Sequence, residues 1–327
     1  DGDWLEPHKT WNGGLDNAAR MIYKDSFRAG ISLSPFRVSE KSKLFKNHID
    51  WLIHDNNNTI IIEDTVNGEQ FFALDITHPE VQKYIQKVFH TLYKMGFIFY
   101  ETQHMAYGFK DSSQTKRKVE GKSSVQCFRE ICSIIRTEIG PGSLWMMDET
   151  PYSPVIGFAD IVEINKGRHG KWNSEQLQQF VRETWYTHYF NNIYWQNSPG
   201  KISLSDENGL TETEKHSIRL WTAILGGAVG TNDNLTKWDR TQLNEFRMLE
   251  PSKQQKNAYL PFWPDENPIK VAVRYYKDRR AWGLLLFNDK NHSVLQTFEL
   301  FDLIEKEKAF VFSWNKNKVQ FGELTQL

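Results

Sequence analysis

Several acidic side chains stand where short apolar runs of the sequence end. Glu101, Asp148 and Glu163 each close such a run, and Glu149 directly follows Asp148. If the runs are strands of one parallel sheet, their carboxyl ends meet at the same edge and these acids can lie close together. Neighbouring carboxyl groups can act as nucleophile and as general acid or base. The alternative is that they are solvated or ion-paired groups at that edge.

Gln103 stands two residues after Glu101. Residues two apart in a strand point to the same side, so we expect both side chains to face the same space. A carboxamide keeps the hydrogen-bonding capacity of a carboxylate. It lacks the negative charge, however, and is a far poorer nucleophile.

Other kinds of reactive site find no support in the sequence. His104, His169 and His188 lack the spacing of metal ligands, and Cys127 and Cys132 are five residues apart in an expected helix. We therefore predict no metal site and no disulfide framework. Neither a G-x-G-x-x-G loop nor a Walker loop is present, and we expect no cofactor.

Charge and hydropathy argue against two classes of partner. The net charge is -1, which gives no electrostatic case for nucleic acid or an anionic membrane, and we interpret the basic run 116–118 as a solvated loop. No apolar run approaches the roughly 18 residues of a membrane span, and the compartment stays unassigned. Aromatic residues make up 14% of the chain, with 12 Trp. They either fill a large core, which we favour, or offer flat faces to sugar rings.

Short apolar segments alternate with amphipathic ones, a pattern typical of βα units around a parallel sheet. Expected strands, each ending in polar residues, cover Ala29–Phe36, Gln70–Thr77, Phe97–Gln103, Ser143–Glu149, Ile161–Asn165, Asn192–Ser198 and Gly227–Asp233. Expected helices cover Pro79–Met95, Val125–Ile139, Glu175–Tyr186 and Thr211–Leu225, the last with a capping box at Thr211 and Glu214. We predict an α/β fold, a (β/α)8 TIM barrel with seven visible strands. The first strand is missing from the chain or is supplied by a second chain.

The pattern changes near residue 267. Four expected strands are separated by turns, at Lys270–Tyr276, Ala281–Phe287, Thr297–Phe301 and Ala309–Trp314. This spacing predicts an antiparallel β unit. We therefore expect a barrel domain over residues 1–260 and a β domain over residues 267–327.

An ordered series of motifs runs along nearly the whole chain. It includes Gly2–Trp4, Trp11–Leu15, Phe27–Phe36, His48–Leu52, Leu74–Val81, Pro151–Asp160, Trp172, Leu210–Glu214, Gly226–Gly227 and Leu286–Asn288. The order of the motifs is more specific than any one of them. The series resembles the melibiase family of α-galactosidases and its raffinose-synthase-like relatives.

The resemblance implies a TIM barrel with a C-terminal antiparallel β-sandwich, and retaining hydrolysis by two carboxyl groups about 5–5.5 Å apart. It also implies which positions carry the chemistry. The nucleophile position holds Gln103 and the acid/base position holds Gly167, while Glu101 and Glu163 stand at the family's Lys and Arg positions. Candidate sugar contacts are Asp3, Trp4, Asp75 and Trp172, although Asp75 could equally cap a helix.

Three hypotheses follow. The leading one is an α-galactosidase-like barrel that is catalytically impaired, and that binds an α-galactoside-like carbohydrate or is a remnant. The second is an active retaining α-glycosidase that uses Glu101 as nucleophile, with Asp148 or Glu163 as acid/base. The third is a structural or partner-binding domain.

Overall fold

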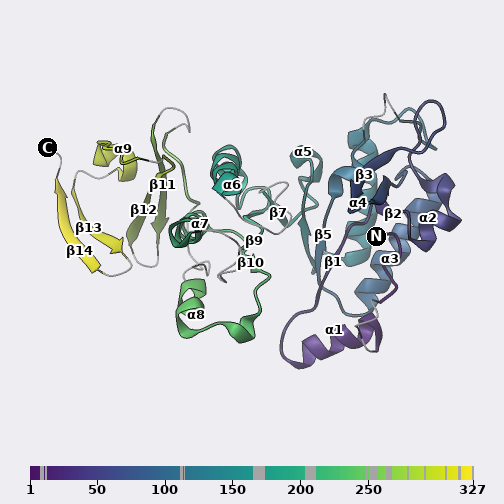
Figure 1. The fold of residues 1–327 in the computed structure, drawn as a ribbon, viewed down its shortest axis with the longest axis horizontal. Coiled ribbons are helices and arrows are strands. Elements are labelled where there is room, and N and C mark those ends of the chain that lie inside the picture. The colour runs from purple at the N-terminus through teal and green to yellow at the C-terminus, as the bar shows by residue number, and fades with distance from the viewer. Residues whose placement is uncertain are drawn as a thin grey trace. The chain divides into compact units, whose positions relative to one another are not determined.

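The computed structural model describes residues 1–7, 11, 13–110, 113, 115–164, 174–202, 211–247, 249, 257–262, 267–277, 280–290, 292–305, 308–315 and 318–325. The chain forms two compact units, residues 1–167 and 168–327. In Figure 1 the first unit runs from purple to teal and the second from teal to yellow.

A parallel sheet forms the centre of the first unit. Its strands lie in the order β1 (Gly30–Leu33), β5 (Phe99–Thr102), β6 (Leu144–Met147) and β7 (Ile161–Glu163). The four expected strands in these regions are confirmed, and so is an α/β fold with a parallel sheet. The register places Glu101 of β5 between Ser32 and Met146.

Two long helices cover one face of this sheet. In α3 (Pro79–Lys94), the expected apolar positions Val81, Ile85, Phe89 and Leu92 are all fully buried. The ring of Phe89 lies 5.8 Å from that of Tyr100 in β5. Helix α4 (Ser124–Ile139) packs beside α3, and its Arg136 guanidinium lies 5.3 Å from the centre of the Trp145 ring in β6. Tyr100 and Trp145 therefore point toward the helices.

One expected barrel strand belongs to a different sheet. The prediction over Gln70–Thr77 is wrong, because β4 (Glu69–Ala73) pairs antiparallel with β2 (Arg37–Ser39) and β3 (Ile62–Val66). A tight turn explains this pairing: Asn67 and Gly68 have φ of 51° and 78°, as a two-residue hairpin turn requires. The Asn-Gly pair indicates a hairpin turn, which the periodicity of the apolar residues does not reveal.

Shorter elements complete the first unit. Helix α1 (Gly14–Lys24) precedes β1, and α2 (Lys43–Asn47) and the 3-10 turn η1 (Ile49–Trp51) lie between β2 and β3. The turn η2 (Met105–Gly108) follows β5, and α5 (Tyr152–Val155) lies between β6 and β7.

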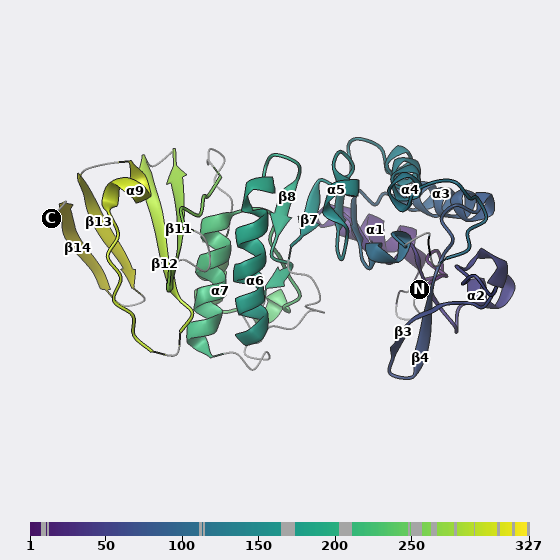
Figure 2. The same ribbon diagram turned by 90° about the horizontal axis from the view of Figure 1, so that it is seen from above.

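The second unit begins with two neighbouring helices, α6 (Ser174–Thr187) and α7 (Glu212–Leu225), which Figure 2 shows side by side. Trp185 and Trp221 stack between them at 5.5 Å. The expected capping box is confirmed, since Thr211 accepts from the Glu214 N–H and the Glu214 side chain accepts from Thr211. The other elements are η3 (His188–Phe190), β8 (Gln196–Ser198), β9 (Lys201–Ile202), β10 (Gly230–Thr231), η5 (Leu235–Lys237) and α8 (Arg240–Arg247), with β9 and β10 parallel.

The C-terminal part holds two antiparallel hairpins. They join β11 (Ile269–Tyr276) to β12 (Ala281–Asn288) and β13 (Lys308–Asn315) to β14 (Lys318–Thr325). Three expected strands are confirmed here. The strand expected over Thr297–Phe301 is wrong, because this segment leads into helix α9 (Leu300–Ile304). The helix buries Leu303 and Ile304 against the apolar side chains of β11. A short apolar run can bury its side chains either as a helix or as a strand, so the pattern alone does not distinguish the two.

Candidate functional site

The predicted acids gather at one edge of the parallel sheet. Glu101 is the next-to-last residue of β5, and Glu163 is the last residue of β7. Gln103 and Asp148 directly follow β5 and β6. Tyr100 faces the helices, so Glu101 and Gln103 face the opposite side of the sheet. This edge and face define the candidate site.

Glu101 and Gln103 touch through their side chains. The Gln103 carboxamide nitrogen Nε2 donates to Glu101 Oε1 in a long hydrogen bond of 3.4 Å. The backbone N–H of Gln103 donates to the carbonyl of Leu33 at 2.9 Å, which holds the end of β5 against β1. Glu101 is only 8% exposed. The Glu101 carboxylate is thus in contact with an amide at the end of its own strand.

Asp148 is held at the end of β6 by its backbone and its side chain. Its N–H donates to the carbonyl of Thr102 at 2.9 Å, and its Oδ1 accepts from the Glu149 N–H at 2.6 Å. Burial raises the pKa of Asp148 to about 6, and the negative charges of Glu149 and Glu101 act in the same direction. The Glu149 N–H and His104 partly oppose this rise. Asp148 can therefore hold a proton near neutral pH.

Two residues beside Asp148 have left-handed backbone angles. His104 has φ of 53° and Glu149 has φ of 47°, and His104 Nδ1 lies 2.7 Å from Glu149 Oε2. His104 Nε2 also lies 3.4 Å from Nη1 of Arg37, which in turn pairs with Asp1 at 3.1 Å. Arginine only donates, so Nε2 is the acceptor and Nδ1–H donates to Glu149.

The Asp1–Arg37–His104–Glu149 chain of contacts was not predicted from the sequence. Its members are up to 148 positions apart, since they run from Asp1 to Glu149. The sequence offers no local pattern for such a network. Left-handed angles in bulky residues are uncommon and gather at sites that the surrounding fold constrains.

Three other predicted site residues make contacts within the protein. The Asp3 carboxylate accepts from the N–H groups of Lys43 and Leu44 at 2.9 and 3.2 Å, at the start of α2. Trp4 packs on Tyr84, with ring centres 5.8 Å apart. These contacts leave a sugar-binding role for Asp3 and Trp4 as a prediction.

Asp75 is buried, and its carboxylate forms hydrogen bonds with two loops. Its Oδ1 accepts from the N–H and the hydroxyl of Thr77, and its Oδ2 accepts from the N–H of Lys118 at 2.6 Å. The residue that caps α3 is His78, whose ring accepts from the Glu80 N–H. Gly167 and Trp172, the remaining predicted site residues, lie outside the described residues.

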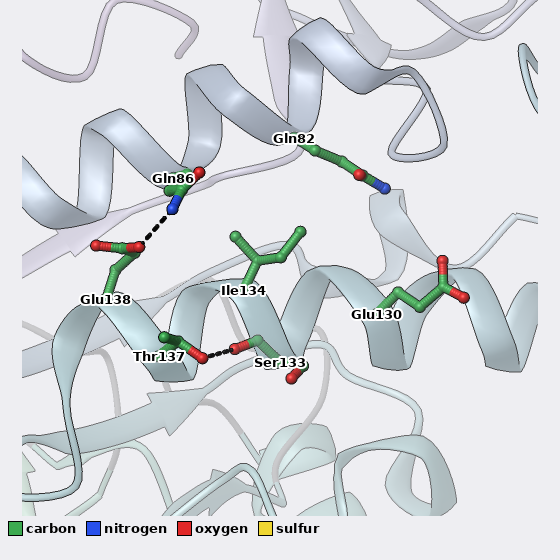
Figure 3. Close-up of a pocket in the computed structure, with 7 residues that line it drawn as sticks. All are labelled: Gln82, Gln86, Glu130, Ser133, Ile134, Thr137 and Glu138. Carbon is green, nitrogen blue, oxygen red and sulfur yellow. Dashed lines mark hydrogen bonds between the residues drawn. The ribbon is translucent and has the colours of Figure 1, made fainter.

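A polar hollow of about 400 Å³ lies between α3 and α4. Figure 3 shows Gln86 of α3 reaching Glu138 of α4 across it, at 2.7 Å. These helices cover the face opposite Glu101, so the hollow is separate from the candidate site. Within the part of the chain that the structure describes, no group of three His, Cys, Asp or Glu side chains could hold a metal ion, and no helix is long and apolar enough to cross a bilayer.

Comparison with known proteins identifies the N-terminal part. Residues 1–135 match the family described as Melibiase. This segment, less than half of the chain, is what the chain shares with that family. The α-galactosidase AgaA of Geobacillus stearothermophilus is 29% identical to it over 84 residues, which are 26% of this chain and 11% of AgaA.

Solved α-galactosidases share the fold. TtGalA from Thermus thermophilus, in complex with p-nitrophenyl α-D-galactopyranoside, superposes with a TM-score of 0.62 and 15% identity, over 75% of this chain and 52% of TtGalA. The Lactobacillus brevis α-galactosidase superposes with a TM-score of 0.64 and 16% identity, over 98% of this chain and 44% of that chain. The chain therefore spans about half the length of these two proteins.

The melibiase resemblance suggests a different chemical role for each residue of the site. The residue that the resemblance predicts at the nucleophile position is Gln103, whose amide cannot supply the negative charge of a carboxylate. The neighbouring Glu101 is negative when ionised, and Asp148 can carry a proton. The edge can thus hydrogen-bond the hydroxyl groups of a sugar, and Asp148, whose pKa is raised, can act there as a proton donor.

Proposed function

We propose that this chain is an α-galactosidase-like carbohydrate-binding barrel with impaired catalysis. A sugar of the α-galactoside class binds at the carboxyl ends of β5, β6 and β7. The relatives supply the class of ligand: TtGalA has been solved with stachyose, and a variant of AgaA with raffinose.

The observation that carries this proposal is the amide of Gln103 beside Glu101. Retaining hydrolysis needs a carboxylate that attacks the anomeric carbon and stabilises positive charge in the transition state. A neutral amide does neither. The contact between Gln103 Nε2 and Glu101 Oε1 at 3.4 Å also engages the nearest carboxylate in a hydrogen bond.

The same edge has what a sugar site needs. Glu101 and Asp148 offer acceptor oxygens, and the Gln103 amide offers both donors and an acceptor. Sugar hydroxyls are donors and acceptors in the same way. Asp148, with a pKa of about 6, can donate or accept according to pH.

The finer architecture belongs to this proposal. We infer that the described parallel strands are part of a closed (β/α)8 barrel. Because the segment Gln70–Thr77 lies outside the parallel sheet, six expected barrel strands remain, and two strands from outside β1–β14, or from a second chain, complete the barrel beside β1. The position of β1 at the end of the strand order β1-β5-β6-β7 supports this. A C-terminal β-sandwich and a boundary between residues 260 and 267 complete the arrangement.

One observation favours a second candidate, slow retaining hydrolysis by Glu101 and Asp148. A general acid works best when its pKa lies near the working pH, and that of Asp148 is about 6. In this reading Glu101 attacks the sugar and Asp148 protonates the leaving oxygen.

Calorimetry and an activity assay separate these candidates. We expect melibiose and raffinose to bind with millimolar affinity, and Gln103→Ala to weaken that binding at least fivefold, while Glu138→Gln on the outer face of α4 leaves it unchanged. Hydrolysis of an aryl α-galactoside is expected to stay at the uncatalysed rate. Turnover that disappears in Glu101→Gln, but persists in Glu138→Gln, would replace the proposal with the second candidate. Absence of binding heat at millimolar sugar would contradict both.

A further inference from the structure

An exposed aromatic surface lies at the turn between α6 and β8. We call residues 188–197 the aromatic turn. Tyr189 and Tyr194 are 54% and 45% exposed, and Ile193 at the tip is 65% exposed. Both tyrosine rings lean on Phe190, with ring centres 4.4 and 5.6 Å from it. Two tyrosines thus present their rings to solvent on a shared aromatic base.

Hydrogen bonds hold this turn in place. The N–H groups of Ile193 and Tyr194 both donate to the carbonyl of Phe190, at 3.0 and 3.1 Å. Asn192, with a left-handed φ of 59°, donates its N–H to the carbonyl of Trp195 at 2.7 Å. The buried Asn191 side chain accepts from the Asn197 N–H and donates to the carbonyl at the end of α7. Rings held in this way lose little freedom on binding, which favours affinity.

The chemistry of the aromatic turn is uncharged. In a chain that is 25% charged, residues 188–197 contain no Asp, Glu, Lys or Arg, and burial lowers the pKa of His188, which keeps its ring neutral at pH 7. The amides of Asn192 and Gln196 are exposed beside the tyrosines. A tyrosine ring has an apolar face and a polar hydroxyl, and the amides both donate and accept. A neutral sugar ring has the matching features, an apolar C–H face and a rim of hydroxyl groups.

The size of the patch also bears on its partner. A stable protein interface involves roughly 20–30 residues on each side. The exposed part of the aromatic turn is five side chains, Tyr189, Asn192, Ile193, Tyr194 and Gln196. This is too small for a second copy of the chain to bind stably, but it is the width of one or two sugar rings.

We propose that the aromatic turn is a surface site for neutral polysaccharide, in which Tyr189 and Tyr194 stack on sugar rings. The aromatic turn ends in the first residues of β8, so its tyrosines lie at the amino end of that strand. The sugar site proposed above is built at the carboxyl ends of strands. The two sites use different residues, in different units of the chain, and this inference does not depend on the proposed function.

Affinity electrophoresis of the full chain tests this site. Galactomannan, a neutral polysaccharide, is cast into a native gel, and polygalacturonate, an acidic one, into a second. We expect galactomannan to retard the wild-type chain and polygalacturonate to have no effect. The double variant Tyr189→Ala/Tyr194→Ala should bind galactomannan about tenfold more weakly, the loss expected when the main aromatic contacts of a small surface are removed.

Two controls keep the result specific. Tyr23→Ala removes an exposed tyrosine from α1 and should be retarded like wild type. Because galactomannan carries α-galactosyl branches that the proposed site at the parallel sheet can bind, the double tyrosine variant is also compared within a Gln103→Ala background, where it should lose the remaining retardation. Thermal unfolding checks that each variant is folded, and Tyr189→Phe/Tyr194→Phe, which keeps the rings, should retain most binding. The proposal is overturned if galactomannan does not retard wild type, if both polysaccharides retard it equally, or if the double variant binds unchanged. It is also overturned if light scattering shows that the double alanine substitution only converts a dimer to a monomer.

Discussion

The imidazole of His104 and the carboxylate of Glu149 meet across the ends of β5 and β6, with Nδ1 and Oε2 2.7 Å apart, although both residues have left-handed backbone angles. The same two segments are joined by backbone hydrogen bonds, from the N–H of Met105 to the carbonyl of Asp148 and from the N–H of Ala106 to that of Glu149. The pair thus fixes the loops that carry Gln103 and Asp148.

The backbone angle of Glu149 predicts an unusual order of stability between two variants. Both Glu149→Gly and Glu149→Ala lose the contact with His104, but only glycine adopts φ of 47° without steric conflict. We expect the glycine variant to be more stable than the alanine variant by about 1 kcal/mol in urea unfolding. Glu130 in the middle of α4 provides the opposite control, since Glu130→Gly should be less stable than Glu130→Ala by about 1 kcal/mol. An alanine variant at 149 that equals the glycine variant would contradict the assigned backbone angle.

The raised pKa of Asp148 predicts how stability depends on pH. The pKa is about 6 in the folded chain and 3.8 in the unfolded reference, so the folded state binds the proton more tightly. This contribution is fully present below pH 4 and is lost as pH rises toward 6 and above. Asp148→Asn, whose side-chain oxygen can still accept from the Glu149 N–H, should remove that loss. We expect it to gain about 1–3 kcal/mol on wild type between pH 4 and pH 7.

Urea midpoints at pH 4, 5, 6 and 7 measure this effect. Asp50→Asn is the matched control, because Asp50 is largely exposed and the same change of charge there should leave the pH profile near that of wild type. Parallel profiles for wild type and Asp148→Asn would show that Asp148 does not titrate near pH 6.

The contact between Gln103 and Glu101 predicts a strong pH effect for Gln103→Glu. This variant places a second carboxylate where Nε2 now lies 3.4 Å from Glu101 Oε1. Like charges in a buried site raise the pKa of one partner, so stability is lost as pH rises through that raised value. We expect a loss of about 1–2 kcal/mol between pH 5 and pH 8, relative to wild type. Gln103→Met, which breaks the hydrogen bond without adding charge, should show no such slope, and equal slopes for the two variants would disprove the contact.

Arg274 connects β11 to the end of α7. Its Nη1 donates to the carbonyls of Ala223 and Ile224, and the residue is only 3% exposed. Burial lowers its pKa, yet the helix C-terminus it contacts is negative and favours the cation. Arg274→Met should leave those carbonyls without a donor and destabilise the chain by about 2–3 kcal/mol. Arg20→Met breaks an exposed ion pair on α1 and should change stability by less than about 0.5 kcal/mol in the same unfolding experiment.

The elements that periodicity predicts well are those whose burial is settled locally. In α3, the spacing of Val81, Ile85, Phe89 and Leu92 defines one apolar face, and that face is buried. The strand over Gln70–Thr77 shows the limit. Its apolar residues predict a strand, but whether it joins the parallel sheet or the hairpin of β3 and β4 depends on a partner that periodicity does not name.

For the candidate site, too, some features follow from the local sequence and others depend on tertiary contacts. Sequence alone determined that Glu101 and Gln103 face the same side and that Asp148 and Glu163 close strands. It also predicts, through the melibiase resemblance, that an amide stands at the nucleophile position. These follow from strand geometry and from the order of residues. Only the tertiary structure decided that Asp148 is partly buried near Glu149 and Glu101, that His104 joins Glu149 to Arg37, and that the Asp3 and Asp75 carboxylates accept backbone N–H groups. Those relationships depend on burial and on distances between segments far apart in the chain, and neither is encoded in local spacing.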